Sequence, residues 1–560
     1  MRQAASRYGR QPLSGNSQRR VSVGRAIPAP VGGWDAQSPL ADMPPENAVI
    51  LDNWIPRAGY VETRRGSAGW STGIPAPVQT GMVLRGIGAD RIFAAAADEI
   101  YDVSFLGDAP VEVYTGTGSA RFQWINFAND GGTFILAANG AADPIRYNGT
   151  DWAPLVITGS SGSVTLDPAQ LIDVMEHKGR TFWVEQASLR VWFLAPNAIQ
   201  GAAGLLDLGG IFDKGGTIVC QANWTVDGGA GADDLAVWVT SEGQVAVYQG
   251  INPADANDWA LVGVYDLGLP MSRRSLIKYG SDLVVLTTDG VVPLSQALKL
   301  DRAQENLVAL TQRIQLAFQN AQRLYGNNFG WEGCLYARGS LAIFNIPIAE
   351  LSNSVQYVQN VQTGAWCRFT GLNAFCWFTA NDNIMFGAVD GIYQWDTAAT
   401  DNGVQIVCDL KTAFNYFGSR GSLKKFEMLQ PILRSSQDAQ PAVEVLTDFR
   451  EAIPTAVPTV VGAASGVWDQ GEWGSALWSE GVEIRDAWTS VTGIGYCGSV
   501  RMRQPIDAVT FFDLAIGDGS LLGVTEDGDA IEITSDTRSE SVLEVIAFNI
   551  KYQNQTGGQL

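Results

Sequence analysis

One pattern recurs seven times between residues 80 and 400 and constrains the fold more than any other feature. Each copy has a polar or glycine-containing turn, an apolar run, a second turn and a short strand rich in Tyr, Trp or Val. The apolar runs start at Ile92, Phe134, Phe182, Leu235, Leu283, Leu341 and Ile384. Their spacings of 42, 48, 53, 48, 58 and 43 residues are typical of small twisted sheets that bury their faces only against neighbouring copies.

This period predicts an all-β chain whose residues 80–405 form a β-propeller of about seven blades. A run of β-sandwich hairpins is the alternative, because short strands at regular spacing also give that fold. The copies share no fixed dipeptide, so the prediction depends on the period alone. The 62 glycines of the chain favour many tight turns and therefore many short strands.

One stretch departs from the strand pattern and predicts a helix over residues 302–325, inserted between the fifth and sixth copies. Apolar residues recur there at helical spacing, with Asp301 as an N-cap and Gly326 as a C-cap. The insertion accounts for the longest spacing, 58 residues. We expect this helix to pack on its own ring, with a neighbouring subunit as the alternative.

Three further regions flank the predicted propeller. Residues 1–33 predict a basic flexible arm, because they contain few large apolar side chains. Residues 34–79 mix prolines with short apolar runs and predict an irregular, packed lead-in. Residues 406–560 return to strand alternation and predict a separate C-terminal β domain. The lead-in could also complete a blade with the last copy, which would abolish free sheet edges.

The C-terminal domain contains a Trp-rich loop in which Trp468, Trp473 and Trp478 lie five residues apart. Five residues is neither the helix period nor the strand period, so we expect these side chains to anchor irregular backbone. The alternative is an exposed aromatic surface that contacts a partner or a membrane interface. These tryptophans are therefore candidate partner-binding residues.

Charge is distributed unevenly along the chain. The first 34 residues contain no acidic residue and six arginines, namely Arg2, Arg7, Arg10, Arg19, Arg20 and Arg25. The other 526 residues contain 31 basic and 58 acidic residues, a net charge of −27. Such a body argues against nucleic-acid binding over the whole surface. The arginines are candidate partner-binding residues for an acidic neighbouring subunit.

Signals for chemistry are weak throughout the sequence. The single histidine, His177, lies in a polar context and is expected in a surface turn, and the six cysteines, without a C-x-x-C pair, are expected to be buried free thiols. No acid pair, phosphate-binding loop or metal motif stands out. We therefore expect no catalytic, cofactor-binding or metal-binding residues and a protein that is not an enzyme. No secretion signal or membrane-spanning run is predicted either.

Several stretches, taken in order, resemble the tail nozzle or hub proteins of short-tailed bacteriophages. They are GGWDAQSPLADMPPENAVILDNWIPRAGYVETRRG (32–66), GWEGCLYARGSLAIFNIP (330–347), VQNVQTGAWCRFTGLNAFCWF (358–378), FGAVDGIYQWD (386–396), FNYFGSRGSLKKFEMLQPILRS (414–435) and GYCGSVRMR (495–503). The resemblance implies a propeller-bearing subunit of a sixfold ring in the virion tail, assembled in the cytoplasm of the bacterial host. It also implies contacts with the adaptor, with tail fibre or spike proteins and with the host envelope at the tip.

In such proteins the ring continues the DNA channel, closes it until genome ejection and anchors neighbouring tail proteins. An acidic wall would suit this role, because like charge repels the phosphate backbone and lets DNA pass without sequence-specific binding. The alternative function is a carbohydrate-binding or carbohydrate-cleaving propeller, in which exposed tryptophans stack on sugars and two acids cut the bond.

Overall fold

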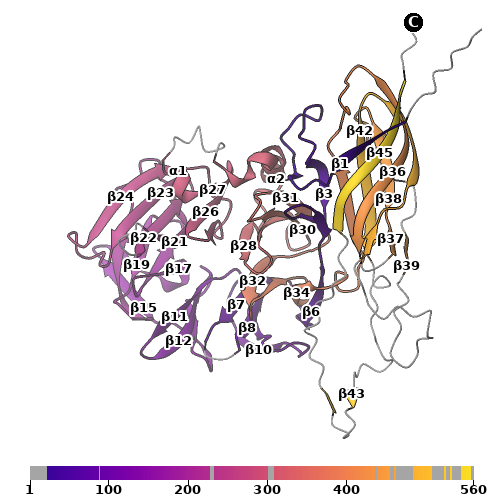
Figure 1. Cartoon of the computed structure of the whole chain (residues 1–560). Coiled ribbons are helices and arrows are strands. Elements are labelled where there is room, and N and C mark those ends of the chain that lie inside the picture. The colour runs from indigo at the N-terminus through magenta and orange to yellow at the C-terminus, as the bar shows by residue number, and fades with distance from the viewer. Residues whose placement is uncertain are drawn as a thin grey trace, which may run out of the picture.

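The computed structural model describes residues 22–86, 89–227, 232–299, 308–435, 438–454, 459–461, 483–506, 523–524, 530–531 and 544–555. Within these residues most of the regular secondary structure is β-strand, with only a few short helices. Small sheets form a ring, called here the propeller, and two larger sheets stack beside it as a sandwich (Figure 1). The prediction of an all-β fold is confirmed.

Blades one to four are antiparallel sheets whose strands follow one another in sequence. Blade one contains β7 (Val78–Leu84), β8 (Arg91–Ala96), β9 (Glu99–Asp102) and β10 (Val111–Thr115). Blade two contains β11 (Gln123–Asn129), β12 (Gly132–Ala138), β13 (Ile145–Tyr147) and β14 (Trp152–Pro154). Blade three contains β17 (Leu171–His177), β18 (Arg180–Glu185), β19 (Arg190–Phe193) and β20 (Gly201–Asp207). Blade four contains β21 (Ile218–Asp227), β22 (Ala232–Thr240), β23 (Gln244–Gly250) and β24 (Trp259–Asp266). The outer edge of blade three is extended by β15 (Ile157–Ser161) and β16 (Val164–Thr165).

The last three blades depart from this simple pattern. Blade five has three strands, β25 (Leu276–Tyr279), β26 (Asp282–Thr287) and β27 (Gly290–Pro293). Blade six contains β28 (Glu332–Tyr336), β29 (Leu341–Ala349), β30 (Asn353–Asn360) and β31 (Trp366–Phe369). Blade seven contains β32 (Cys376–Ala380), β33 (Asn383–Gly387), β34 (Gly391–Ala398) and, as its outermost strand, β6 (Gly66–Thr72) from the lead-in.

The ring closes because each innermost strand contacts the next blade, and blade seven contacts β7 of blade one. Strand β6 pairs with β34 in antiparallel register, so a segment from before the first blade completes the last one. The seven-bladed propeller is confirmed, and a strand of the lead-in completes its last blade.

Packing between blades explains the sequence period. The predicted apolar run of every copy falls on the second strand of a blade, where both faces are covered by neighbouring blades. In β8, Ile92 and Ala94 face the core shared with blade seven, whereas Phe93 and Ala95 face the core shared with blade two. A strand covered on both faces reads as a continuous apolar run rather than as an alternating one. Separate cores of this kind follow one another around blades one to five.

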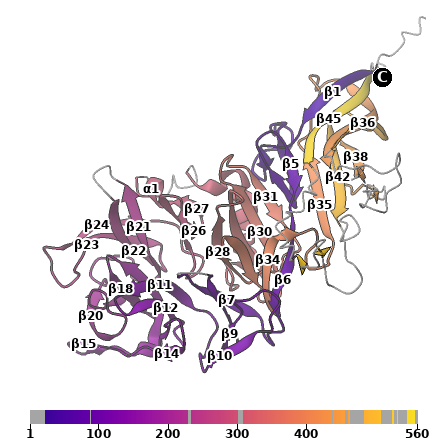
Figure 2. The same cartoon turned by 60° about the horizontal axis from the view of Figure 1, so that its bottom comes forward.

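The sandwich is assembled from both ends of the described chain, as the indigo and yellow strands show in both views (Figure 2). One sheet contains β4 (Trp54–Pro56), β5 (Val61–Thr63), β45 (Glu544–Gln555), β36 (Leu423–Ser435) and β40 (Glu483–Arg485), with β1 (Val23–Pro28) on β45 and β41 (Thr489–Gly495) on β36. The other sheet continues blade six through β3 (Asn47–Asp52), β35 (Ile406–Thr412), β42 (Gly498–Ile506) and β38 (Ala442–Thr447), with β2 (Gly33–Trp34) beside β3.

Residues 34–79 therefore differ from the irregular lead-in that the sequence predicts, because they supply β2 to β6 and the first residues of β7. These strands are two to seven residues long and are interrupted by prolines and turns, so no period emerges from them. The predicted arm 1–33 likewise ends earlier than expected, because β1 pairs with β45 along its whole length.

The helical insertion is present in part. A 3₁₀ turn, η3 (Leu310–Ile314), leads into α2 (Gln315–Tyr325), and residues 300–307, including the expected N-cap Asp301, lie outside the described part. Ile314 and Phe318 are buried with Trp331 of the propeller, so the helix packs on its own ring as expected. Shorter elements are α1 (Leu294–Ala297), η1 (Pro168–Gln170), β37 (Asp438–Gln440), β39 (Thr459–Val461), β43 (Gly523–Val524) and β44 (Ala530–Ile531).

A buried arginine fastens the propeller to the sandwich. Arg64, between β5 and β6, has a fully buried side chain and forms an ion pair with Asp401. Its Nε donates to Asn53 Oδ1 at 2.8 Å, and its terminal nitrogens reach both Asp401 oxygens and two backbone carbonyls. All five guanidinium hydrogens are therefore used. The partners come from the lead-in, the end of blade six and the segment that leaves blade seven.

Candidate functional site

Most of the predicted partner-binding residues cannot be placed. Five arginines of the arm and the three loop tryptophans, namely Arg2, Arg7, Arg10, Arg19, Arg20, Trp468, Trp473 and Trp478, lie outside the described residues. Arg25 is the exception, and it lies exposed on β1 at the edge of the sandwich.

The expectation for His177 is wrong. This residue ends β17 and is fully buried between blades three and four, against Phe182 and Trp259. Its Nδ1 lies 3.2 Å from Asn223 Oδ1, and its Nε2 lies 3.0 Å from the carbonyl oxygen of Gly250. The turn itself begins one residue later, where Lys178 has a φ of 49°. The polar residues next to His177 in the sequence therefore gave a wrong prediction of its exposure, since its side chain points into the core.

The prediction of buried free thiols is confirmed, since all six cysteines are unpaired and five are buried. Burial raises the pKa of the Cys334 and Cys376 thiols to about 12. Among the described residues no group of His, Cys, Asp or Glu side chains has the arrangement of a metal site. In the same part of the chain, no helix has the length and apolar character to traverse a bilayer.

The side chain of Arg274, just before blade five, forms hydrogen bonds to several other blades. Its guanidinium donates across the ring to blade one, at Gln79 O (3.0 Å) and Thr80 Oγ1 (2.6 Å). It also donates to blade two, at Phe122 O (3.2 Å) and Gln123 Oε1 (3.2 Å). Since blade five faces blades one and two across a seven-membered ring, this side chain crosses the axis of the propeller.

Glu332, the first residue of β28 in blade six, completes this axial network. Its Oε2 accepts from Arg274 Nη1 at 2.8 Å, and its Oε1 accepts from the backbone N–H of Trp377 in blade seven. Burial raises the pKa of the Glu332 carboxyl, and Arg274 opposes that shift. The Arg274 guanidinium also lies 5.2 Å from the ring centre of Phe329. One ion pair thereby links blades one, two, five, six and seven.

Two further titratable residues, Arg273 and Asp173, lie near this network toward blades three and four. Arg273 donates to the Asn139 carbonyl oxygen at 3.1 Å. Asp173 on β17 is buried, and its oxygens accept from the N–H groups of Val174 (2.8 Å) and Gln221 (3.2 Å). Burial nevertheless raises the pKa of Asp173 to about 8, with the hydrogen bonds and Arg273 acting in the opposite direction. Asp173 is therefore mostly protonated at neutral pH.

Together these side chains fill one end of the propeller axis, where the innermost strands begin. Closed β architectures gather ligand-binding groups at the mouth of their central channel. Here Arg274 and Glu332 are instead bound to each other, Arg273 and Arg274 also donate to backbone carbonyls, and Asp173 accepts from backbone N–H groups. Sequence analysis missed them, although two signals exist: the Arg273–Arg274 doublet ahead of an apolar strand, and Glu332 between Trp331 and an apolar run.

Comparison with known proteins gives remote likenesses only. No family model and no curated protein matches the chain. A quinoprotein alcohol dehydrogenase-like protein from Bacteroides thetaiotaomicron is similar at 10% identity and a TM-score of 0.32, over 56% of this chain and 68% of that one. The Cps50 (Swd1) β-propeller domain from Myceliophteria thermophila is similar at 11% identity and a TM-score of 0.36, over 60% and 98%.

A third solved structure, BBS1N in complex with ARL6DN, is similar at 15% identity and a TM-score of 0.27, over 39% of this chain. This chain spans 64% of the length of that BBS1N chain. The three proteins differ in their described roles, so they carry no functional argument. The class of protein follows from the chain's own sheets: it is a seven-bladed β-propeller joined to a β-sandwich.

Proposed function

We propose that this protein is a non-enzymatic structural subunit of a short-tailed bacteriophage tail, in which copies form a ring that continues the DNA channel. The observation that carries the structural part of the proposal is the filled propeller axis. Arg274 and Glu332 occupy the position where a catalytic or lectin propeller would open to its ligand. Resemblance to tail nozzle proteins in residues 32–66 and 330–435 supports the assignment to a virion tail.

The filled axis also decides where DNA would pass. A duplex cannot thread a bore that one arginine side chain crosses, so the channel must be the space enclosed by several copies. The net charge of −27 outside the first 34 residues suits such a wall, because it repels the DNA backbone. Adaptor, fibre or spike proteins and the host envelope would then contact the outer surfaces of the ring.

The basic N-terminal segment supplies a contact within this assembly. Residue Arg25 lies exposed on β1, and five further arginines precede it in the sequence. An acidic neighbouring copy or adaptor is the partner that this charge fits. Removing residues 1–21 leaves β1 in place and should weaken assembly without changing the fold of the subunit. Unchanged assembly would show that the segment has no such partner.

Mass photometry of the full-length chain tests the ring directly. Six copies of 60.1 kDa give a species of about 360 kDa, alone or after addition of the purified adaptor. Electron microscopy of that species should show propellers around an open lumen. A protein that stays monomeric with the adaptor present, or a purified monomer that cleaves or binds sugar chains, would contradict the proposal.

A further inference from the structure

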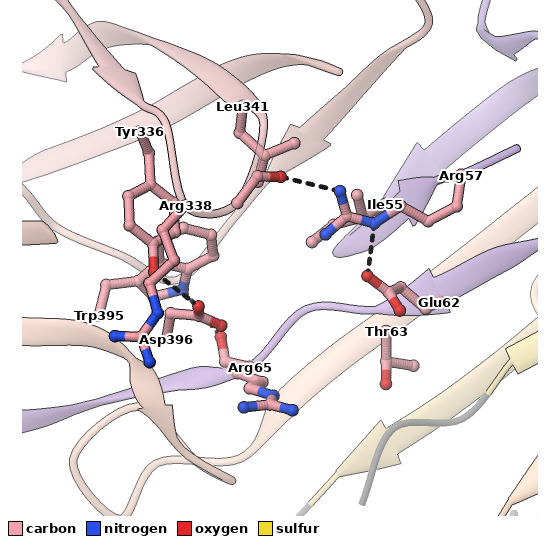
Figure 3. A pocket seen from close by; sticks show the side chains of 11 residues that line it. Ile55, Arg57, Glu62, Thr63, Arg65, Tyr336, Arg338, Leu341, Trp395 and Asp396 are labelled. Carbon is pink, nitrogen blue, oxygen red and sulfur yellow. Dashed lines mark hydrogen bonds and ion pairs between the residues drawn. The ribbon is translucent and has the colours of Figure 1, made fainter. Parts of the chain in front are cut away.

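A cavity of about 160 Å³ lies where the sandwich meets blades six and seven (Figure 3). Its charged lining consists of Arg57, Glu62, Arg65, Arg338 and Asp396. The connection between β4 and β5, strand β5 itself and the residues after β5 supply the first three, and the hairpin of blade six and β34 of blade seven supply the others. The cavity therefore spans the junction between the two parts of the molecule and lies away from the propeller axis.

One ion pair, between Arg57 and Glu62, already neutralises two of the charged groups in the cavity wall. Arg57 Nε donates to Glu62 Oε1 at 2.7 Å, and Arg57 Nη1 donates to the Gly339 carbonyl oxygen at 2.9 Å. The Asp396 carboxylate accepts from Tyr336 Oη at 2.9 Å. Arg57 and Glu62 lie on one side of the cavity, and Tyr336 and Asp396 lie on the other, as Figure 3 shows.

The remaining two guanidinium groups have no carboxylate partner in the described part of the chain. The guanidinium of Arg338 donates to Asn383 Oδ1 at 3.2 Å. The half-buried side chain of Arg65 forms no hydrogen bond or ion pair with any described residue. Its neighbour Arg64 uses all five of its donors, so the two adjacent arginines differ sharply.

Arg65 is nevertheless held firmly in place. Its backbone carbonyl oxygen accepts from Arg64 Nη1 at 3.0 Å and from Trp395 Nε1 at 2.9 Å, and both donors are on buried side chains. Two buried side chains therefore fix the backbone at Arg65. The main chain at Arg65 is therefore already ordered before a partner binds, and only the side chain loses rotamer freedom on binding.

We propose that this cavity binds an oxyanion, with the Arg65 guanidinium as the principal donor and Arg338 as the second. A guanidinium presents paired N–H groups that match two oxygens of a carboxylate or a phosphate. One water needs about 10–15 Å³ of cavity volume. The cavity of about 160 Å³ therefore admits a group of roughly ten heavy atoms. The buried rings of Tyr336 and Trp395 give it an apolar wall for the remainder of the ligand.

Binding here would also join the two parts of the molecule. Arg65 belongs to the segment between sandwich and blade seven, whereas Arg338 belongs to the hairpin of blade six. An anion held by both would add a bridge parallel to the existing bond from Arg57 to Gly339. A bound oxyanion should therefore raise the temperature at which the full-length chain unfolds.

The test is a titration of the full-length protein with inorganic phosphate and, separately, with acetate, with sodium chloride adjusting ionic strength. Calorimetry and the unfolding temperature should both show saturable binding. Substitution Arg65→Gln should lower the affinity about tenfold or more, as loss of a hydrogen bond to a charged group predicts, and Arg338→Gln should lower it less. Arg323→Gln on helix α2 removes the same charge from an exposed position and should leave binding unchanged.

The pattern of anions identifies the source of the ligand. Saturable binding of phosphate alone indicates a phosphate group, and binding of acetate alone indicates a carboxylate, such as an acidic side chain of a partner chain. Binding of neither anion overturns the proposal, as does a response that Arg65→Gln and Arg323→Gln share. If Arg65→Gln fails to fold, crystals of the unaltered protein soaked in selenate decide, because anomalous density must lie beside Arg65.

Discussion

Replacing Arg64 by methionine should strongly destabilise the chain. The substitution keeps the apolar stem over the Phe369 ring, whose centre lies 5.6 Å from the guanidinium carbon, and removes all five hydrogen bonds. It also leaves the Asp401 carboxylate, 9% exposed, without its countercharge. Removing one partner of a buried ion pair costs about 3–5 kcal/mol of unfolding free energy, and we expect a loss in that range.

Urea unfolding followed by tryptophan fluorescence measures this loss. The matched control is Arg420→Met, which breaks an ion pair with Asp42 whose two side chains are 64% and 63% exposed. Exposed pairs contribute little because water and salt screen them, so the control should unfold at nearly the same urea concentration as the unaltered protein. The Arg64→Met and Asp401→Leu double variant should lose less than the sum of the single losses, because neither partner is then left buried alone.

Equal midpoints for Arg64→Met and Arg420→Met would refute this reasoning. They would mean that the five contacts of Arg64 are replaced by water at no cost. Additive losses in the double variant would be equally damaging, because they would show that Arg64 and Asp401 stabilise the fold independently of each other.

Three further predictions concern the propeller. Gly81→Ala places a Cβ 2.1 Å from the Phe378 ring, where blade seven packs against blade one. This variant should lose about 1–3 kcal/mol of unfolding free energy, measured with urea. Gly86→Ala is the control, because no atom lies within 4 Å of the added Cβ, and it should lose little unfolding free energy. Arg274→Met leaves Glu332 buried and unpaired, so its stability deficit should shrink at pH 5, where Glu332 can take a proton; a deficit independent of pH would contradict this. The raised pKa of Asp173, about 8, means that the folded state holds a proton that the unfolded state releases above about pH 4. Stability should therefore fall as pH rises from 5 to 8, and Asp173→Asn should show a smaller fall; parallel pH profiles would refute it.

The propeller could be predicted from sequence because its central strands are covered on both faces. Seven apolar runs at similar spacing follow from that burial, and each one marks the second strand of a blade. The sandwich could not be predicted in the same way, because its strands come from residues 23–63 and from residues beyond 406. Pairings such as β1 with β45 join residues more than 500 positions apart, and short strands carry no period that reveals such a partner.

The axial network escaped prediction for a different reason. Arg274 and Glu332 belong to no sequence motif with a chemical signature. Their proximity arises only when the ring brings the first residues of distant inner strands to one end. The same holds for Arg65, since Arg64 and Arg65 are chemically identical in sequence and only the folded chain separates a fully bonded guanidinium from one that faces a cavity.

The pairing of β6 with β34, and of β1 with β45, has a consequence for biosynthesis. When the ribosome has made β6, more than 300 residues must still be translated before its partner Gly391–Ala398 exists. Strand β1 waits even longer, until the last strand leaves the exit tunnel. Strands β1 and β6 therefore stay without their partner strands for most of synthesis. Unpaired strand edges expose the nascent chain to misassembly. Deletion of β45 (Glu544–Gln555) should accordingly leave the sandwich incompletely folded and bound by chaperones, even where the blades fold.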